Sequence, residues 1–229
     1  MKGVFIVIDG TDGSGKATQV KRLLMRLQEQ GRRVELVDFP RYGMPSAYFV
    51  EKYLRGEYGT LQEMTPERSS LFFALDRYDA SFTIRQWLQD GTIVLSNRYV
   101  SANKGHQMAK IEDTERQKKF LDWLNHLEYS ILGIPKPDLT ILLHVPADVG
   151  YELVAKKDER GYLDGKKRDI HEADLEHLRA AERAYLQLPS LDTEETWSIV
   201  ECIDGDRLLS IEEIHERLWS RIEPLISSI

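Results

Sequence analysis

The chain has 229 residues, of which 41% are hydrophobic, enough for a sizeable core, and it carries a formal net charge of −7. An acidic balance argues against nonspecific nucleic-acid binding, which requires a basic surface, although a local cluster of donors can still bind a nucleotide. With a single cysteine, Cys202, and no apolar run near the roughly 20 residues of a membrane span, we expect one cytoplasmic domain over residues 1–229, without an internal disulfide or a membrane partner.

Strand and helix patterns alternate along the whole chain. Uninterrupted apolar runs predict buried strands, and apolar spacings of three and four predict helices. The alternation is typical of an α/β fold, a parallel sheet with helices on both faces, whose ligands bind at the carboxyl ends of the strands. The predicted strands are 3–8, 34–37, 93–95, 139–145 and 197–203, and the predicted helices are 15–31, 47–54, 65–90, 113–132, 147–157, 171–187 and 210–226.

Polar segments follow several of these elements and are expected at the ligand-binding edge. They comprise residues 10–17, 38–43, 96–107 and 158–168. The last segment is charged, contains two glycines and has no apolar periodicity, so a lid over about 158–171 is predicted there.

The first polar segment resembles a phosphate-binding loop between a buried strand and a helix. The pattern requires Gly-x-x-x-x-Gly-Lys and then Ser or Thr. Ala17 takes the hydroxyl position here, and Thr18 comes one residue late. Backbone N–H groups and the helix N-terminus would hold phosphates, and Lys16 would reach the β- and γ-phosphates; the alternative is a glycine-rich turn that binds nothing. The predicted ATP-binding residues are Gly10, Asp12, Gly13, Ser14, Gly15, Lys16, Ala17 and Thr18.

The chain lacks the sequence signatures of other classes of P-loop protein. A GTPase needs Asn-Lys-x-Asp to read guanine, but Asn103 begins Asn-Lys-Gly-His. A motor or transport ATPase needs an apolar strand that ends in an acid, whereas strand 93–95 leads into Ser96 and Asn97. Arginines near predicted strand ends instead suit two phosphate-bearing ligands that meet head to head, because guanidinium groups bind phosphate oxygens in pairs. These arginines are Arg41, Arg77, Arg98, Arg160 and Arg168.

Six segments, in order from residue 1 to about 190, together resemble thymidylate kinases, the P-loop enzymes that phosphorylate dTMP with ATP. The resemblance implies a P-loop NTPase three-layer sandwich with a parallel central sheet and a helical lid, Mg²⁺ beside ATP, and a homodimer. Helix 65–90 could bury a face in a partner, although core packing would give the same pattern. The segments are Asp12–Lys16, Phe39–Gly43, Leu71–Arg77, Asn97–Asn103, Leu132–Asp138 and Arg160–Glu172.

The resemblance implies a pocket for dTMP. Phe73 would stack on the thymine ring, or else belong to the core. Arg77 would donate to a thymine carbonyl, or else pair with a helix neighbour. Asn103 would pair with the base edge or form a loop turn, and His106 would pack under the deoxyribose or be structural. The other implied acceptor residues are Phe39, Arg41, Tyr42, Arg98, Gln107 and Glu172, with Arg41 and Arg98 on the phosphate.

The implied catalytic set follows from the charge of the acceptor. A phosphate monoester is largely dianionic near neutral pH, so the nucleophile needs alignment and neutralisation more than a base. Gly13 and Ser14 stand where some members of the family place an arginine, which implies that the lid supplies positive charge. The implied catalytic residues are Lys16, Arg98, Arg160, Asp12 and Asn97, with Arg160 and Arg168 from the lid.

The metal side of the site departs from the family pattern. Asn97 replaces the usual aspartate before Arg98, and Ala17 removes a hydroxyl that often ligates magnesium. The implied metal residues are Asp12, Asp169 and Glu172, although Asp12 could only form a turn and the other two could only complement a helix dipole. Two alternatives to a dTMP kinase stay open: a kinase for another deoxypyrimidine nucleotide, and a catalytically weak nucleotide-binding homologue.

Overall fold

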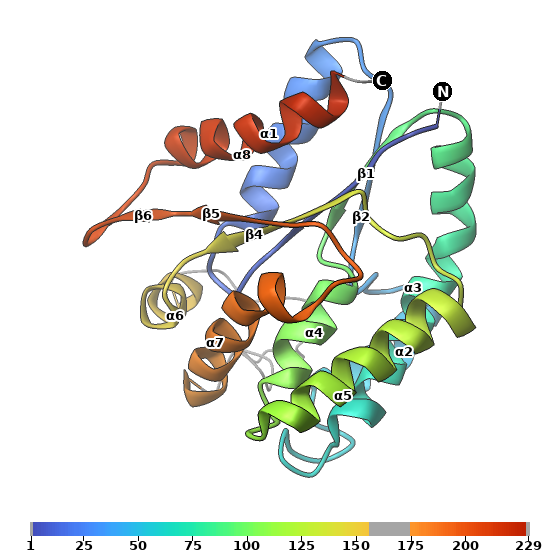
Figure 1. Cartoon of the computed structure of the whole chain (residues 1–229), viewed down its shortest axis with the longest axis vertical. Coiled ribbons are helices and arrows are strands. Elements are labelled where there is room, and N and C mark those ends of the chain that lie inside the picture. The colour runs from blue at the N-terminus through green and yellow to red at the C-terminus, as the bar shows by residue number, and fades with distance from the viewer. Residues whose placement is uncertain (1, 156–174, 228–229) are drawn as a thin grey trace.

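The structure, a computed structural model, describes residues 2–155 and 175–227. A five-stranded sheet in the order β2-β3-β1-β4-β5 forms its centre, and every neighbouring pair of strands is parallel (Figure 1). This confirms the predicted fold class. The strands are β1 (Phe5–Asp9), β2 (Val34–Asp38), β3 (Ile93–Asn97), β4 (Leu139–His144) and β5 (Trp197–Glu201).

Helices connect these strands. They are α1 (Lys16–Glu29), α2 (Tyr48–Leu54), α3 (Pro66–Gln89), α4 (Val100–Met108), α5 (Thr114–Asn125), α6 (Ala147–Ala155), α7 (Leu175–Leu191) and α8 (Ile211–Ile226). A 3₁₀ turn, η1 (Pro45–Ala47), precedes α2, and a π-helical turn, η2 (His126–Ile131), extends α5. The predicted lid lies outside the described residues.

Two sequence predictions about local structure were wrong. Residues 96–107 were expected to be a polar loop, but most of them form α4, whose polar residues are buried and therefore show no apolar periodicity. The strand expected over 197–203 ends at Glu201, and a short antiparallel hairpin of β6 (Ile203–Asp204) and β7 (Arg207–Leu208) follows it.

The helices begin where their sequences provide caps. Thr65 precedes α3, and its hydroxyl accepts a hydrogen bond from the backbone N–H of Arg68 at 3.3 Å, while Pro66 occupies the first turn without losing a needed donor. Ser210 and Glu213 form a capping box at the start of α8. Local sequence therefore sets the starts of these helices.

Side chains of the central strand alternate between two cores. Ile6 and Ile8 pack into the cluster that contains Leu23 of α1 and Leu218 of α8. Phe5 and Val7 instead enter a second cluster, which includes residues of α3, α4, α5 and α7. Because successive strand residues point to opposite faces, the sheet becomes the middle of three layers. Figure 1 shows α1 and α8 over one face and α3, α4, α5 and α7 over the other.

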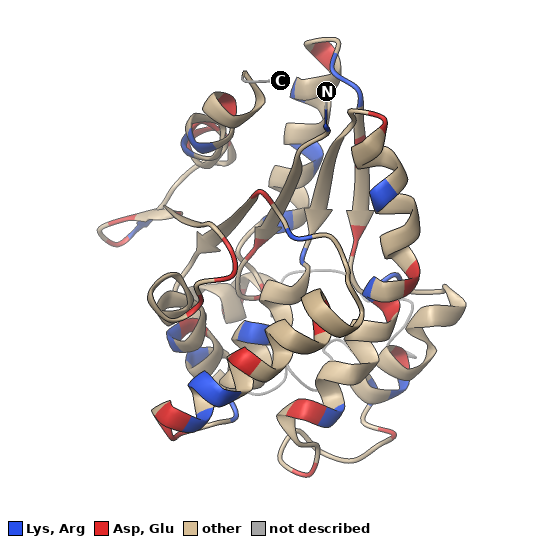
Figure 2. Ribbon diagram, turned by 45° about the vertical axis from the view of Figure 1, so that its right-hand side comes forward, with Lys and Arg blue, Asp and Glu red and all other residues tan. Residues whose placement is uncertain are grey.

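The carboxyl ends of β1, β2 and β3 meet at one edge of the sheet. Asn97 at the end of β3 is in register with Ile8 of β1 and with Asp38 of β2. In Figure 2 the strands are uncharged over most of their length, and acidic residues mark their ends. Polar groups therefore gather where a parallel sheet binds its ligands. In the part of the chain that is described, no helix combines the length and apolarity needed to cross a membrane.

Candidate active site

The turn between β1 and α1 depends on glycine. Gly13 has a φ of +84°, and a Cβ there would lie 2.2 Å from the carbonyl oxygen of Gly150. Gly15, with a φ of +82°, caps α1 in the left-handed conformation. Other residues are strained in this conformation, whereas glycine adopts it readily. The loop therefore curls tightly and places the N-terminus of α1 beside the sheet edge, where a helix favours anions.

Lys16 extends back over this loop. Its Nζ donates hydrogen bonds to the carbonyl oxygens of Gly10 at 2.9 Å and Thr11 at 2.8 Å, and it lies 3.9 Å from the Asp12 carboxylate. Only 7% of the residue is exposed. The loop carbonyls thus hold the ammonium group against the loop, and Lys16 also lines the cavity described next.

A cavity of about 350 Å³ joins the phosphate-binding loop to α3 and α4. This volume lies within the range of small-molecule sites. The cavity brings together most of the predicted site residues: Asp12, Gly13, Gly15, Lys16, Ala17, Phe39, Tyr42, Phe73, Arg77, Asn97, Arg98, Asn103, His106 and Gln107. It is also lined by Asp38, Pro40, Leu54, Tyr99 and Ala102, which were not predicted.

The remaining predicted residues lie elsewhere. Gly10 and Ser14 belong to the loop without lining the cavity, and Thr18 is exposed on α1. Arg41 points toward α3, where its guanidinium contacts Asp76 at 2.9 Å and Asp79 at 2.5 Å. Its expected phosphate contact stays a prediction. The predicted site residues Arg160, Arg168, Asp169 and Glu172 lie outside the described residues.

Arg98 is fixed by its backbone as well as by its side chain. Its φ is +66°, unusual for a residue other than glycine, and its N–H donates to the Ile8 carbonyl at 3.0 Å. Its guanidinium pairs with Asp12 and lies 3.7 Å from Asp9. Burial acts to lower the pKa of Arg98, but these carboxylates hold that pKa well above its ordinary value. The result is a permanent positive charge aimed into the cavity.

His106 contacts that charge directly. Its Nε2 lies 3.2 Å from Nη1 of Arg98, and its ring packs edge-on to Tyr185 at 5.6 Å between centroids. Burial, followed by the charge of Arg98, lowers the pKa of His106 well below its ordinary value. The imidazole is therefore neutral at neutral pH, and its Nε2 can accept a hydrogen bond from Arg98.

Residues of α3 and α4 form the far wall of the cavity. Phe73 is half-buried, and its ring meets Tyr53 edge-on at 6.0 Å. The Asn103 amide donates to the carbonyl oxygen of Ser70 at 3.1 Å. Gln107 accepts a hydrogen bond from the Ser69 hydroxyl at 2.7 Å. These contacts join the two helices and fix the orientation of both amides.

Arg77 is held by a residue that the sequence did not indicate. The side chain is 1% exposed, and its Nε donates to the Glu128 carboxylate at 3.1 Å. Its Nη1 also donates to the Tyr99 carbonyl at 3.3 Å. The ion pair that the sequence left open is therefore present, although the partner comes from η2, 51 residues away, rather than from α3. Burial acts to lower the pKa of Arg77, but the charge and the hydrogen bonds of Glu128, with smaller contributions from Tyr99 and Asp76, together raise it above its ordinary value.

Asp9 is a second residue that sequence reasoning missed. It is fully buried at the end of β1, where it accepts hydrogen bonds from the Gly10 N–H at 2.7 Å, the Tyr185 hydroxyl at 3.1 Å and the Ser101 hydroxyl. Its position directly before the glycine of the loop was an available signal. Tyr185 offered none, because it is 176 residues away in the chain.

Asp38 is the third such residue. Its Oδ1 accepts a hydrogen bond from the Asn97 amide at 2.8 Å. Neighbouring groups shield this exposed carboxylate from part of the solvent and raise its pKa, although Arg98, the Asn97 hydrogen bond and Lys16 act in the opposite direction. Its place at the end of the short strand 34–37 was visible in the sequence.

Known proteins resemble this chain over nearly its whole length. The family model described as thymidylate kinase matches residues 8–217. The thymidylate kinase of Mycobacterium tuberculosis is 32% identical over 207 residues, which cover 90% of this chain and 95% of that protein. A probable thymidylate kinase of Pyrococcus abyssi is 30% identical and covers 97% of both chains. A solved structure of thymidylate kinase from Candida albicans shares the fold, with a TM-score of 0.70, 22% identity and coverage of 97% of this chain and 92% of that one. The chain belongs to the thymidylate kinase family.

Proposed function

We propose that this protein transfers the γ-phosphoryl group of ATP to dTMP and releases ADP and dTDP. One observation carries the proposal: a single continuous cavity contains Lys16 of the phosphate-binding loop and also Phe73, Arg77 and Asn103. A protein that only sensed ATP would need the loop but not an aromatic face, a buried arginine and an oriented amide beside it. Membership of the thymidylate kinase family supports the same reaction.

Phosphoryl transfer requires alignment and charge neutralisation. Lys16 would contact the β- and γ-phosphates of ATP, and Arg98 would hold the dTMP phosphate as the nucleophile. Asp12 pairs with Arg98 and lies near Lys16, so it aligns the two cations with each other. We propose that Arg160 and Arg168 add positive charge to the transferred group when both nucleotides are bound, as electrostatic stabilisation of the transition state requires.

The base would lie between α3 and α4. Phe73 offers a flat apolar surface for stacking. Arg77 carries only N–H donors, and Glu128 and the Tyr99 carbonyl use some of them. The remaining donors suit a carbonyl oxygen of the base, and they disfavour an exocyclic amine such as that of cytosine. Asn103 and Gln107 would contact the base edge.

The side-chain oxygen atoms at the carboxyl ends of the strands are ligands of the type that Mg²⁺ binds. The described residues hold no cluster of three or more His, Cys, Asp or Glu side chains able to bind a metal ion. Mg²⁺ in kinases is bound largely by substrate phosphates and water, with one or two carboxylates, so such a cluster is not required. Asn97 Oδ1 is buried without a partner among the described residues, and Asp12 supplies a nearby carboxylate. Magnesium there would neutralise phosphate charge, and Asp169 and Glu172 stay proposed contributors.

We also infer a homodimer that forms through α3. Four large apolar side chains are exposed at a spacing of three or four residues, which places them along one face of this helix. They are Leu71 (42% exposed), Leu75 (49%), Tyr78 (38%) and Phe82 (58%). A contiguous apolar face of this kind marks an interaction surface. The single cysteine suits a reducing compartment, so we infer a cytoplasmic location.

The test is an ADP-release assay with ATP and Mg²⁺ that offers dTMP, dUMP, dCMP, UMP and thymidine in parallel. We expect turnover with dTMP far above that with the other acceptors. The variant Lys16→Met should remain folded by circular dichroism and lose turnover, which excludes a contaminating kinase. No turnover of the wild-type protein with any acceptor, despite saturable dTMP binding, would overturn the proposal.

A further inference from the structure

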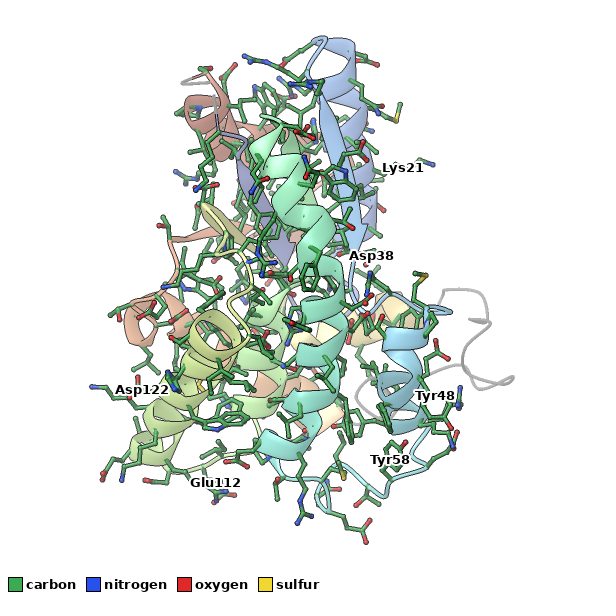
Figure 3. The ribbon with its side chains drawn as sticks, turned by 90° about the vertical axis from the view of Figure 1, so that its right-hand side faces the viewer. Lys21, Asp38, Tyr48, Tyr58, Glu112 and Asp122 are labelled. Atoms are coloured by element: carbon green, nitrogen blue, oxygen red, sulfur yellow. The ribbon has the colours of Figure 1, made fainter. Side chains whose placement is uncertain are left out.

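The carboxyl ends of β2 and β3 place an acid beside an amide. Asp38 is the last residue of β2 and Asn97 the last of β3, and the two are register partners. Adjacent strands lie about 4.8 Å apart, so an acid can move from one strand end to the next with little change in position. Figure 3 labels Asp38 where β2 ends.

The Asp38 side chain faces the cavity rather than the core. It is exposed and lines the same cavity as Lys16, Arg98 and Asn97. Its Oδ1 accepts the Asn97 amide hydrogen at 2.8 Å, which orients the carboxylate. An orienting hydrogen bond to a carboxylate is typical of groups that surround metal ions.

The other acidic groups near this edge already contact protein cations, hydroxyl groups or the backbone. Asp12 pairs with Arg98 and lies 3.9 Å from Lys16. Asp9 is fully buried and binds the loop N–H and Tyr185. Among the described residues that line the cavity, Asp12 and Asp38 are the acids. Of these two acids, Asp12 lies within ion-pair distance of a protein cation, whereas Asp38 forms no ion pair with a cation of the described residues.

We propose that Asp38 supplies the carboxylate that positions nucleotide-bound magnesium, with Asn97 as its oriented neighbour. The inference rests on the proposed kinase function and assigns a residue to its metal side. P-loop enzymes commonly hold Mg²⁺ with an aspartate at a strand end next to the loop, and Asn97 cannot provide that negative charge. In this chain the acid has moved one strand outward, from β3 to β2.

The test exchanges the two side chains and measures metal binding without catalysis. Mn²⁺ is titrated into the protein in the presence of ADP and dTMP, and free Mn²⁺ is followed by electron paramagnetic resonance. The variant Asp38→Asn should weaken Mn²⁺ binding at least about tenfold, the usual effect of losing such a carboxylate. The double variant Asp38→Asn with Asn97→Asp should recover most of the affinity, because the acid returns at the register partner.

Glu35→Gln is the matched control, since it removes one negative charge from the exposed face of the same strand. It should leave Mn²⁺ affinity unchanged. Wild-type affinity in Asp38→Asn, or no recovery in a folded double variant, would overturn the inference. These results are separate from the proposed function, which fails if the wild-type protein does not phosphorylate dTMP, whatever its affinity for Mn²⁺.

Discussion

At the scale of single residues, neighbouring side chains of one type have different roles. Phe72 and Phe73 are both half-buried on α3 and both pack against the small core around Tyr53. Phe72 stacks on Phe49 with 5.8 Å between centroids, whereas Phe73 lines the cavity. A difference of one residue turns the side chain by about 100° around a helix. Only the tertiary structure shows which ring faces the cavity.

Replacement of Phe73 by alanine should therefore weaken dTMP binding. Stacking of a base on an aromatic ring contributes about 1–3 kcal/mol, so KM for dTMP should rise about 5- to 150-fold while KM for ATP stays close to the wild-type value. Steady-state kinetics with each substrate varied in turn measures both. Phe72→Ala is the matched control and should lower stability without this selective effect; an equal rise in KM for dTMP in both variants would contradict a stacking role.

At the scale of elements, the π-helical turn η2 supports the two helices, α3 and α4, that form the far wall of the cavity. Glu128 pairs with Arg77 of α3. The next residue, Tyr129, donates its hydroxyl hydrogen to Glu195 at 2.6 Å, and Glu195 binds the buried Lys104 of α4 at the same distance. Single π-helical turns occur frequently at functional sites. Here two successive side chains of the turn support α3 and α4, the helices that carry the proposed base-binding residues.

Glu128→Gln tests this role. The variant leaves the buried Arg77 charge unbalanced, which should destabilise the fold by about 3–5 kcal/mol in chemical denaturation. The freed guanidinium should also lose its orientation, so the preference for dTMP over dCMP should fall at least tenfold in kcat/KM. Glu128→Asp keeps the charge and should restore part of the preference. Tyr129→Phe on the same turn should lower stability but retain the preference, and an unchanged preference in folded Glu128→Gln would refute the positioning role.

At the scale of the whole molecule, one face of α3 exposes large apolar side chains that pack against no core formed by the described residues of the single chain. Its exposed residues extend over three turns, from Leu71 to Phe82. On the opposite side of the same helix, Asp76 and Arg77 are buried. Asp76 pairs with Arg41, and Arg77 pairs with Glu128 and lines the cavity. A partner that covered this face would therefore restrain the helix that carries Phe73 and Arg77.

The variant Phe82→Glu should dissociate the proposed dimer. Light scattering after size-exclusion chromatography should give twice the 26.5 kDa chain mass for the wild-type protein and the monomer mass for the variant, because a charge is costly in a buried apolar contact. Met25→Glu, at a position 50% exposed on α1, should remain dimeric. A monomeric wild-type protein at micromolar concentration would contradict this inference.

The sequence by itself determined the class of fold and the nucleotide-binding loop. Buried strands and amphipathic helices have distinct apolar periods, and a phosphate loop is encoded in contiguous residues such as Gly15 and Lys16. The resemblance to thymidylate kinases also indicated most of the residues that line the cavity. These features are local, so a reading of neighbouring residues recovers them.

Only the tertiary structure decided which charged and polar groups meet. Glu128 and Arg77 are 51 residues apart, and Asp38 and Asn97 are 59 apart, so no local pattern joins either pair. Residues 96–107 were misjudged for the same reason. The buried polar residues of α4 obtain their partners from α3 and from the segment after α7, and a helix stabilised in this way lacks the apolar stripe by which sequence analysis recognises helices. Long-range pairing of polar groups is a property of the folded chain, because burial makes each such group require a partner that the fold alone brings near.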